Sequence, residues 1–111
     1  MEMQEQRQGA VTVLKPVGPL CQDDASQFRK RAGELLTRSL GRFVVDASAI
    51  PYVDSKGLEG LVELTEILGQ SGQVLKLCAV NDTLREVLDL TDLASMFEPY
   101  EDVTAAVRSF L

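Results

Sequence analysis

Residues 42–61, with the sequence RFVVDASAIPYVDSKGLEGL, decide how this chain folds. The run from Phe43 to Val45 is wholly apolar and lacks the polar alternation of a half-exposed strand. Such a run is typical of a strand that is buried on both faces, and Asp46 ends it. The stretch therefore predicts a central strand inside a sheet.

The residues after this strand predict a loop followed by a helix. Asp54 and Ser55 are typical of a helix start, and apolar or small residues then recur at helical spacing: Leu58, Leu61, Val62, Thr65 and Leu68. A serine hydroxyl at this place lies near unpaired backbone N–H groups and the positive end of the helix dipole. Ser55 is therefore a reasonable site for an added phosphate, although Ser is also a common helix N-cap.

Strands and helices alternate along the rest of the chain. Further strands are predicted at residues 10–17, 74–80 and 96–100, and residues 1–9 form a frayed end or an edge strand. Asp23 or Asp24 is expected to cap a helix that reaches about Leu40, with Gly41 as the left-handed residue after its end. Five residues are expected on its buried face: Ala25, Phe28, Ala32, Leu35 and Leu36. Two later helices are expected to follow the caps Asn81 and Asp102, and the second is expected to end at Phe110. Because such alternation gives parallel or mixed sheets, we predict one α/β domain over residues 1–111, with four or five strands and about four helices.

Composition limits the cellular environment and the kinds of binding partner that we expect for this chain. The 111-residue chain has a net charge of −6, which argues against binding to nucleic acid or to anionic membranes. No apolar run reaches the roughly twenty residues that a membrane span needs, so we expect no membrane insertion. Cys21 and Cys78 lie in no motif, and the N-terminus lacks a signal peptide. These features predict a reduced, cytoplasmic protein in which Cys78 is a small buried hydrophobe.

The residue types also argue against most enzyme classes. The chain contains no His and no phosphate-binding glycine motif, so we expect no catalytic residue, no metal site and no cofactor. Asp46 and Asp54 flank one loop, where acids usually serve as turn and capping residues. A receiver-like domain is a weaker alternative, since Asp23, Asp24 and Lys76 only loosely mimic its acidic pair and its lysine. A nucleotide-binding domain is also a weaker alternative, since the phosphate-binding glycines are missing.

Residues 44–46 (VVD) and 54–58 (DSKGL) resemble the STAS family, the sulfate transporter and anti-sigma factor antagonist domains. By this resemblance, Ser55 is the residue that a partner kinase phosphorylates. The resemblance also implies a partner-facing surface, which contains Asp54, Ser55, Lys56, Gly57, Glu59, Asp23 and Asp24. The chain departs from the common antagonist pattern at Lys56, Glu59 and Cys21. For Gly57 two interpretations are open, close packing within the domain and close approach of a partner.

The function implied by the resemblance is a protein-interaction switch without catalysis of its own. The unmodified protein would bind an anti-sigma factor, which is a serine kinase of the histidine-kinase-like ATPase type, and so release a sigma factor. Phosphorylation of Ser55 by that kinase would end the interaction, and a serine phosphatase would restore it. The alternative within the same family is a constitutive subunit of a larger assembly, such as a lipid-transport ATPase complex.

Overall fold

The computed structural model describes residues 1–111 and contains one mixed sheet of five strands in the order β1-β2-β3-β4-β5. The strands are β1 (Glu2–Gln8), β2 (Val11–Val17), β3 (Phe43–Asp46), β4 (Leu75–Cys78) and β5 (Phe97–Tyr100). β1 pairs antiparallel with β2, and all other neighbours are parallel. The predicted α/β fold is confirmed, and residues 2–8 form an edge strand.

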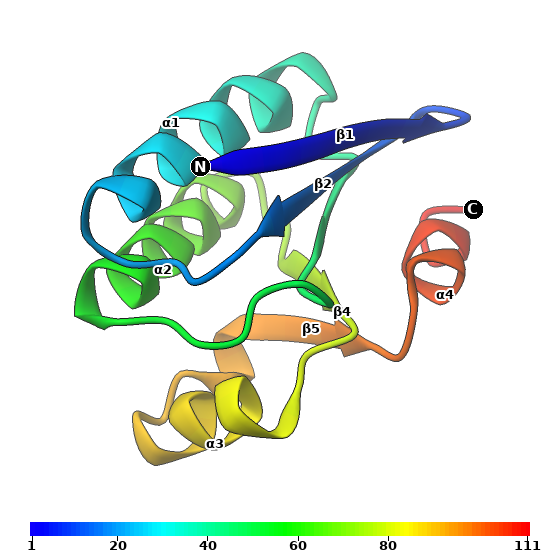
Figure 1. Cartoon of the computed structure of the whole chain (residues 1–111). Helices are drawn as coiled ribbons and strands as arrows, with labels where there is room; N and C mark the ends of the chain where they lie inside the picture. The colour runs from blue at the N-terminus through cyan, green and yellow to red at the C-terminus, as the bar shows by residue number, and fades with distance from the viewer.

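Helices cover the two faces of this sheet unequally (Figure 1). The helices are α1 (Gln22–Arg38), α2 (Ser55–Gly69), α3 (Asp82–Leu90) and α4 (Val103–Arg108), and the short 3-10 turn η1 (Ala94–Met96) precedes β5. The larger apolar cluster joins the sheet to α1, α2 and α3, whereas a smaller cluster joins it to α4. None of these helices is long and apolar enough to cross a membrane.

The central strand β3 is buried on both faces, as its apolar run predicts. Phe43 and Val45 belong to the larger cluster and Val44 to the smaller one. β4 is its parallel neighbour, and Leu61 and Leu68 of α2 are buried against this sheet. Cys78 is also fully buried, as expected of a small hydrophobe.

The buried face of α1 follows the predicted helical spacing. All five residues expected on that face are buried: Ala25, Phe28, Ala32, Leu35 and Leu36. The helix ends at Arg38 rather than near Leu40, because Leu40 and Gly41 both take left-handed backbone conformations, with φ of 56° and 84°. Gly41 therefore has the predicted left-handed conformation, but Leu40 before it is left-handed as well.

Several predicted ends were wrong. β4 covers only residues 75–78 of the predicted 74–80, because Val74 is exposed before the sheet and Ala79 turns away with φ of 56°. Met96 belongs to η1 rather than to β5. Asn81 and Asp102 cap α3 and α4 as predicted, but α4 ends at Arg108 rather than at Phe110.

The packing of α2 gives a test of the core. We expect Leu61→Ala to lower the free energy of unfolding by about 2–5 kcal/mol, because it removes a large side chain that is 1% exposed. Ile67→Ala on the same helix is the matched control. Because Ile67 is 41% exposed, this variant should lower the free energy of unfolding much less. Urea unfolding measures both. A loss below about 1 kcal/mol for Leu61→Ala would contradict this assignment of the core.

Candidate functional site

The candidate site lies at the carboxyl end of β3, where a loop leads into α2. Two neighbouring segments hold this loop. Leu20 donates its N–H to the carbonyl of Tyr52 and accepts the N–H of Asp54, both at 3.1 Å. From the other side, the Asn81 side-chain amide donates to the carbonyl of Ile50 at 2.8 Å. The start of α2 is therefore fixed by contacts to the β2–α1 connection and to the start of α3.

Asp54, not Ser55, is the N-cap of α2. Its Oδ1 accepts the N–H of Gly57 at 2.9 Å, and its Oδ2 accepts the N–H of Gln22 at 3.0 Å. These hydrogen bonds, with that of Gly57 first, hold the pKa of the Asp54 carboxyl below its ordinary value and keep it ionised. One carboxylate thus caps α2 and also binds the start of α1.

Ser55 is the first residue of α2 and is exposed. The interpretation of Ser55 as the N-cap was wrong, because the neighbouring carboxylate satisfies the Gly57 amide. Its hydroxyl is therefore left out of the cap and faces solvent. The backbone N–H groups of the first helical turn lie beside it, which is a favourable setting for negative charge.

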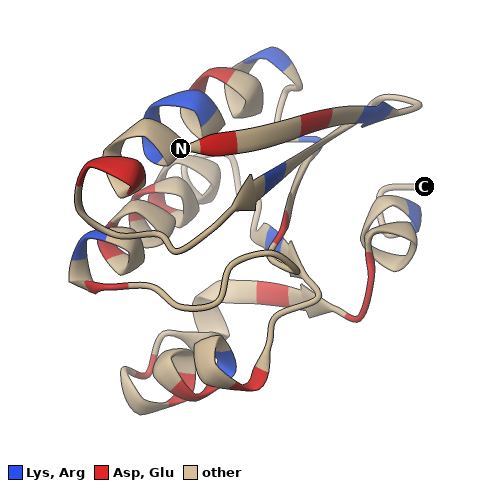
Figure 2. Ribbon diagram, viewed as in Figure 1, with Lys and Arg blue, Asp and Glu red and all other residues tan.

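Charged residues of both signs lie at this helix start (Figure 2). Lys56 and Glu59 are both exposed and form an ion pair at 3.7 Å. Such an exposed pair contributes little to stability. Both side chains are accordingly available for interaction with another molecule.

Asp23 and Asp24 lie in the first turn of α1 but do not cap it. The N-cap position is Cys21, whose side chain makes no capping hydrogen bond, so the predicted cap was wrong. Gln22 takes a left-handed conformation, with φ of 50°, and donates its N–H to Asp54. This contact brings the start of α1 next to the start of α2, while Asp24 approaches the N-terminal amine at 3.6 Å.

Gly57 is buried beneath the β2–α1 connection. A Cβ at this position would lie 2.2 Å from the Leu20 carbonyl oxygen and 2.9 Å from Leu20 Cβ. No side chain fits there without a backbone shift, so packing within the domain is a sufficient reason for this glycine. The helix can approach the Leu20 backbone closely only because residue 57 has no side chain.

The two acids that flank the loop have separate backbone partners. Asp46 accepts the N–H of Ser48 at 3.0 Å in a tight turn, and Asp54 caps α2. These are the turn and capping roles expected from their positions. Lys76 lies within β4, where its ammonium group pairs with Glu98 at 3.0 Å and contacts the Phe110 ring.

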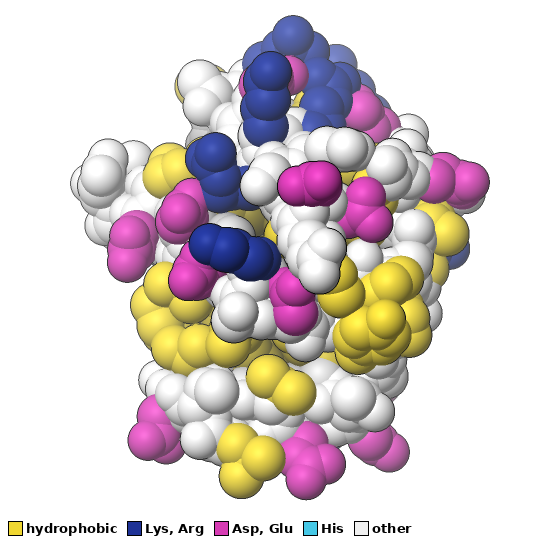
Figure 3. Space-filling model, turned by 60° about the vertical axis from the view of Figure 1, so that its left-hand side comes forward, with side chains coloured by type: hydrophobic (Ala, Val, Ile, Leu, Met, Phe, Trp, Pro, Cys, Tyr) yellow, Lys and Arg dark blue, Asp and Glu magenta, His cyan; other side chains and the backbone are white.

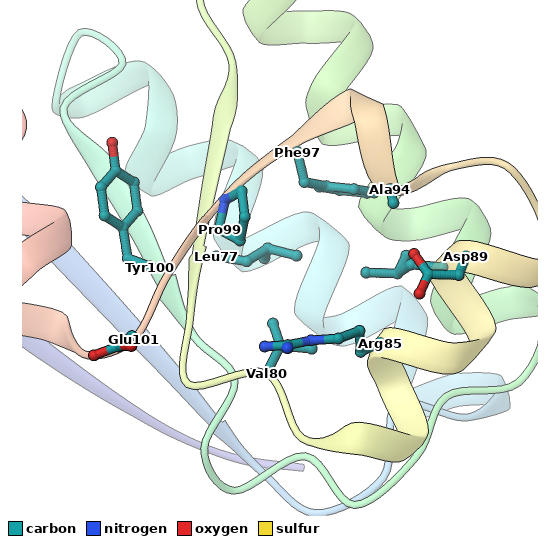
Figure 4. A pocket seen from close by; sticks show the side chains of 10 residues that line it. Leu77, Val80, Arg85, Asp89, Ala94, Phe97, Pro99, Tyr100 and Glu101 are labelled. Atoms are coloured by element: carbon teal, nitrogen blue, oxygen red, sulfur yellow. The ribbon is translucent and has the colours of Figure 1, made fainter.

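A separate apolar cleft of about 410 Å³ lies between α3 and β5 (Figure 4). Its apolar lining includes Leu77, Leu88 and Phe97. Arg85 extends across its mouth from α3. The Tyr100 side chain points away from the cleft, toward the opposite face of the sheet, where its hydroxyl accepts a hydrogen bond from Lys76 at 3.2 Å. The cleft can bury an apolar group, but none of the residues that line it belongs to the Ser55 site.

The residues that sequence reasoning missed are Leu20, Gln22 and Asn81. Leu20 and Gln22 contribute backbone groups, so the identity of their side chains gives no signal for this role. Asn81 was predicted as a cap, and its cap is confirmed by the acceptance of the Leu84 N–H at 2.8 Å. Its second contact, to the loop before α2, has no signal in the local sequence.

Comparison with known proteins identifies the fold family. The family model for the STAS domain matches residues 2–106. No curated protein matches the chain by sequence. The resemblance carried by residues 44–46 and 54–58 is thus confirmed at the level of the whole domain.

Several solved structures are similar to this chain. A candidate anti-sigma factor antagonist from Thermotoga maritima superposes with a TM-score of 0.87 at 22% identity, covering 96% of this chain and 92% of that one. An anti-sigma factor antagonist from Mycobacterium paratuberculosis gives 0.82 at 22% identity, covering 97% and 92%. The phosphorylated form of the Bacillus cell fate determinant SpoIIAA gives 0.71 at 16% identity, covering 97% and 99%. These likenesses show a common fold.

The glycines of α2 give a matched test of the local packing. We expect Gly57→Ala to destabilise the protein by about 1–3 kcal/mol, because its Cβ would overlap the Leu20 backbone. Gly60→Ala should instead stabilise it by up to about 1 kcal/mol, since a Cβ there meets Arg29 and Ala25 atoms only at 3.7 and 3.8 Å. Urea unfolding compares the two variants. Equal stabilisation by both would show that Gly57 is not a packing residue.

Proposed function

This chain belongs to the STAS domain family, and we propose that it acts as an anti-sigma factor antagonist, a protein-interaction switch controlled by phosphorylation of Ser55. The observation that carries the proposal is the exposed Ser55 hydroxyl on the first residue of α2, beside a cap that is supplied by Asp54. A kinase can reach this hydroxyl without unfolding the helix. The similar protein SpoIIAA has been solved in both unphosphorylated and phosphorylated forms.

The proposed partner is an anti-sigma factor that is also a serine kinase of the histidine-kinase-like ATPase type. The unmodified chain would bind it in the cytoplasm and release a sigma factor, and a serine phosphatase would reverse the modification. Exposure and position support a docking surface around Ser55, Lys56 and Glu59, with Asp23 beside it on α1. In this proposal the chain supplies a surface and an acceptor hydroxyl, and the partner supplies the catalysis.

Asp54 and Gly57 have an indirect part in the proposed surface. Asp54 is half-buried and engaged by two backbone amides, and Gly57 is buried against Leu20. We propose that these residues position Ser55 and Lys56 for the partner. Asp24 is similarly engaged, since it lies near the N-terminal amine.

The modification is tested by reaction of the purified chain with ATP and the kinase encoded nearest to its gene. We expect a single phosphate, mapped to Ser55 by mass spectrometry, and no incorporation into Ser55→Ala. Ser48→Ala is the matched control, because Ser48 is an exposed serine in the same loop. Phosphate on another residue, or unchanged incorporation into Ser55→Ala, would refute the proposed acceptor. A chain that binds its partner but is never modified would favour the constitutive-subunit alternative.

The consequence of phosphorylation is a second prediction. A phosphate adds about −1.5 to −2 charges, which a helix N-terminus tolerates. A docked partner, however, would meet a new charge at a surface from which water has been removed. We therefore expect Ser55→Asp to weaken binding of the kinase at least tenfold, about 1.4 kcal/mol, while the free energy of unfolding changes by less than about 1 kcal/mol.

The control for this variant is Thr83→Asp, which places the same charge in the exposed first turn of α3. Calorimetric titration with the kinase and urea unfolding of the free chain measure the two quantities. If Ser55→Asp left binding intact and collapsed stability, Ser55 would be a structural residue. If both variants weakened binding equally, the effect would be general repulsion rather than a switch.

A further inference from the structure

A shallow groove of about 500 Å³ runs along α2 from the candidate phosphorylation site. Its floor is apolar and is formed by Leu58, Val62 and Leu93, the last of which belongs to the segment between α3 and η1. Figure 3 shows hydrophobic side chains gathered in a band on this side of the molecule, with acidic side chains above and below the band. We call this surface, with Ser55 at one end, the α2 groove.

The lining residues follow the helix in register. Ser55, Glu59, Val62 and Glu66 are spaced by four, three and four positions, so they lie along one line of α2. The line from residue 55 to residue 66 is about 16 Å long at 1.5 Å per residue. This length matches about three turns of a second helix laid beside α2.

The charges along the margin of the groove are predominantly acidic. Glu59, Glu63 and Glu66 line it, whereas no lysine or arginine does. Glu59 pairs with Lys56 at 3.7 Å and Glu63 pairs with Arg29 at 3.1 Å, but Glu66 has no cationic partner. The paired side chains are about half exposed or more, so a docked cation can compete for them at little cost.

We propose that the α2 groove binds a basic amphipathic helix. Leucine-like side chains of that helix would fill the floor over Leu58, Val62 and Leu93, and lysine or arginine on its flank would pair with Glu59 and Glu66. An apolar seam with i, i+3, i+4 and i+7 anchors is the usual way a helix occupies such a groove. The proposal rests on the proposed function in one respect, because the helix is assigned to the same partner that modifies Ser55.

The probe is a synthetic 18-residue helical peptide with leucines at i, i+3, i+4 and i+7 and lysines on the flanks. It is titrated into the ¹⁵N-labelled full chain, and the backbone amide shifts are followed. We expect saturable shifts confined to residues 55–66 and to Leu93. A peptide of the same design with glutamate in place of lysine should bind at least tenfold more weakly.

Two variants with the same change in charge distinguish binding in the groove from non-specific electrostatic attraction to the protein. Glu66→Lys should weaken binding of the lysine peptide at least tenfold, because it places a cation on the margin of the groove. Glu86→Lys, at an exposed position of α3 that does not line the groove, should change its affinity less than twofold. Urea unfolding confirms that both variants are folded.

Four outcomes would overturn the proposal. The first is the absence of saturable shifts, and the second is a set of shifts elsewhere, for example around the cleft between α3 and β5. The third is equal weakening by Glu66→Lys and Glu86→Lys, which would mean non-specific attraction to an acidic protein. Concentration-dependent shifts of the same residues without peptide would assign the groove to a second copy of this chain and would also overturn it.

The peptide experiment does not require the kinase, so it separates the two proposals. A groove that binds the peptide in a chain whose Ser55 is never modified would leave an interaction surface without the switch. A Ser55 that is modified in a chain that ignores the peptide would leave the switch without the groove.

Discussion

The carboxylate of Asp54 fixes the geometry on which the rest of this site depends. Its two oxygens accept N–H groups from Gly57 and Gln22, which belong to different helices. One ionised side chain therefore caps α2 and also binds the first residue of α1. Because hydrogen bonds to a carboxylate are stronger than neutral ones, this contact is a firm link between the two helix starts.

Close approach of backbones completes this link. Gly57 lets α2 lie against the Leu20 carbonyl, and Leu20 in turn pairs with the loop at Tyr52 and Asp54. The loop before Ser55 is thus held by backbone hydrogen bonds and by Asn81 rather than by a large apolar side chain. Such an arrangement places a small hydroxyl at a defined point of the surface without covering it.

The sequence-based predictions succeeded where neighbouring residues decide the structure and failed where contacts to distant segments decide it. The strand at residues 43–45 and the buried face of α1 were predicted correctly, because burial leaves a periodic or continuous apolar pattern in neighbouring residues. The cap of α1 was predicted wrongly because Asp23 and Asp24 are residues that commonly cap helices, whereas the observed N-cap, Cys21, makes no capping hydrogen bond. The first residue of the helix, Gln22, is instead bound by a carboxylate from a distant segment, that of Asp54, and no local pattern reports such a contact. The two interpretations of Gly57 could not be separated for the same reason, since the atom it avoids lies in another loop.

The same arrangement separates the residues that maintain the fold from those available to a partner. Asp54, Gly57 and Leu20 are half-buried or buried and face one another, whereas Ser55 and Lys56 face solvent. A charge added at Ser55 therefore meets helix amides and water in the free protein, and neither opposes it strongly. In a complex the water is removed, and an unpaired charge then becomes costly. In the proposed switch, the asymmetry between these two states is the physical basis on which a small covalent change at Ser55 would alter binding while the domain stays folded.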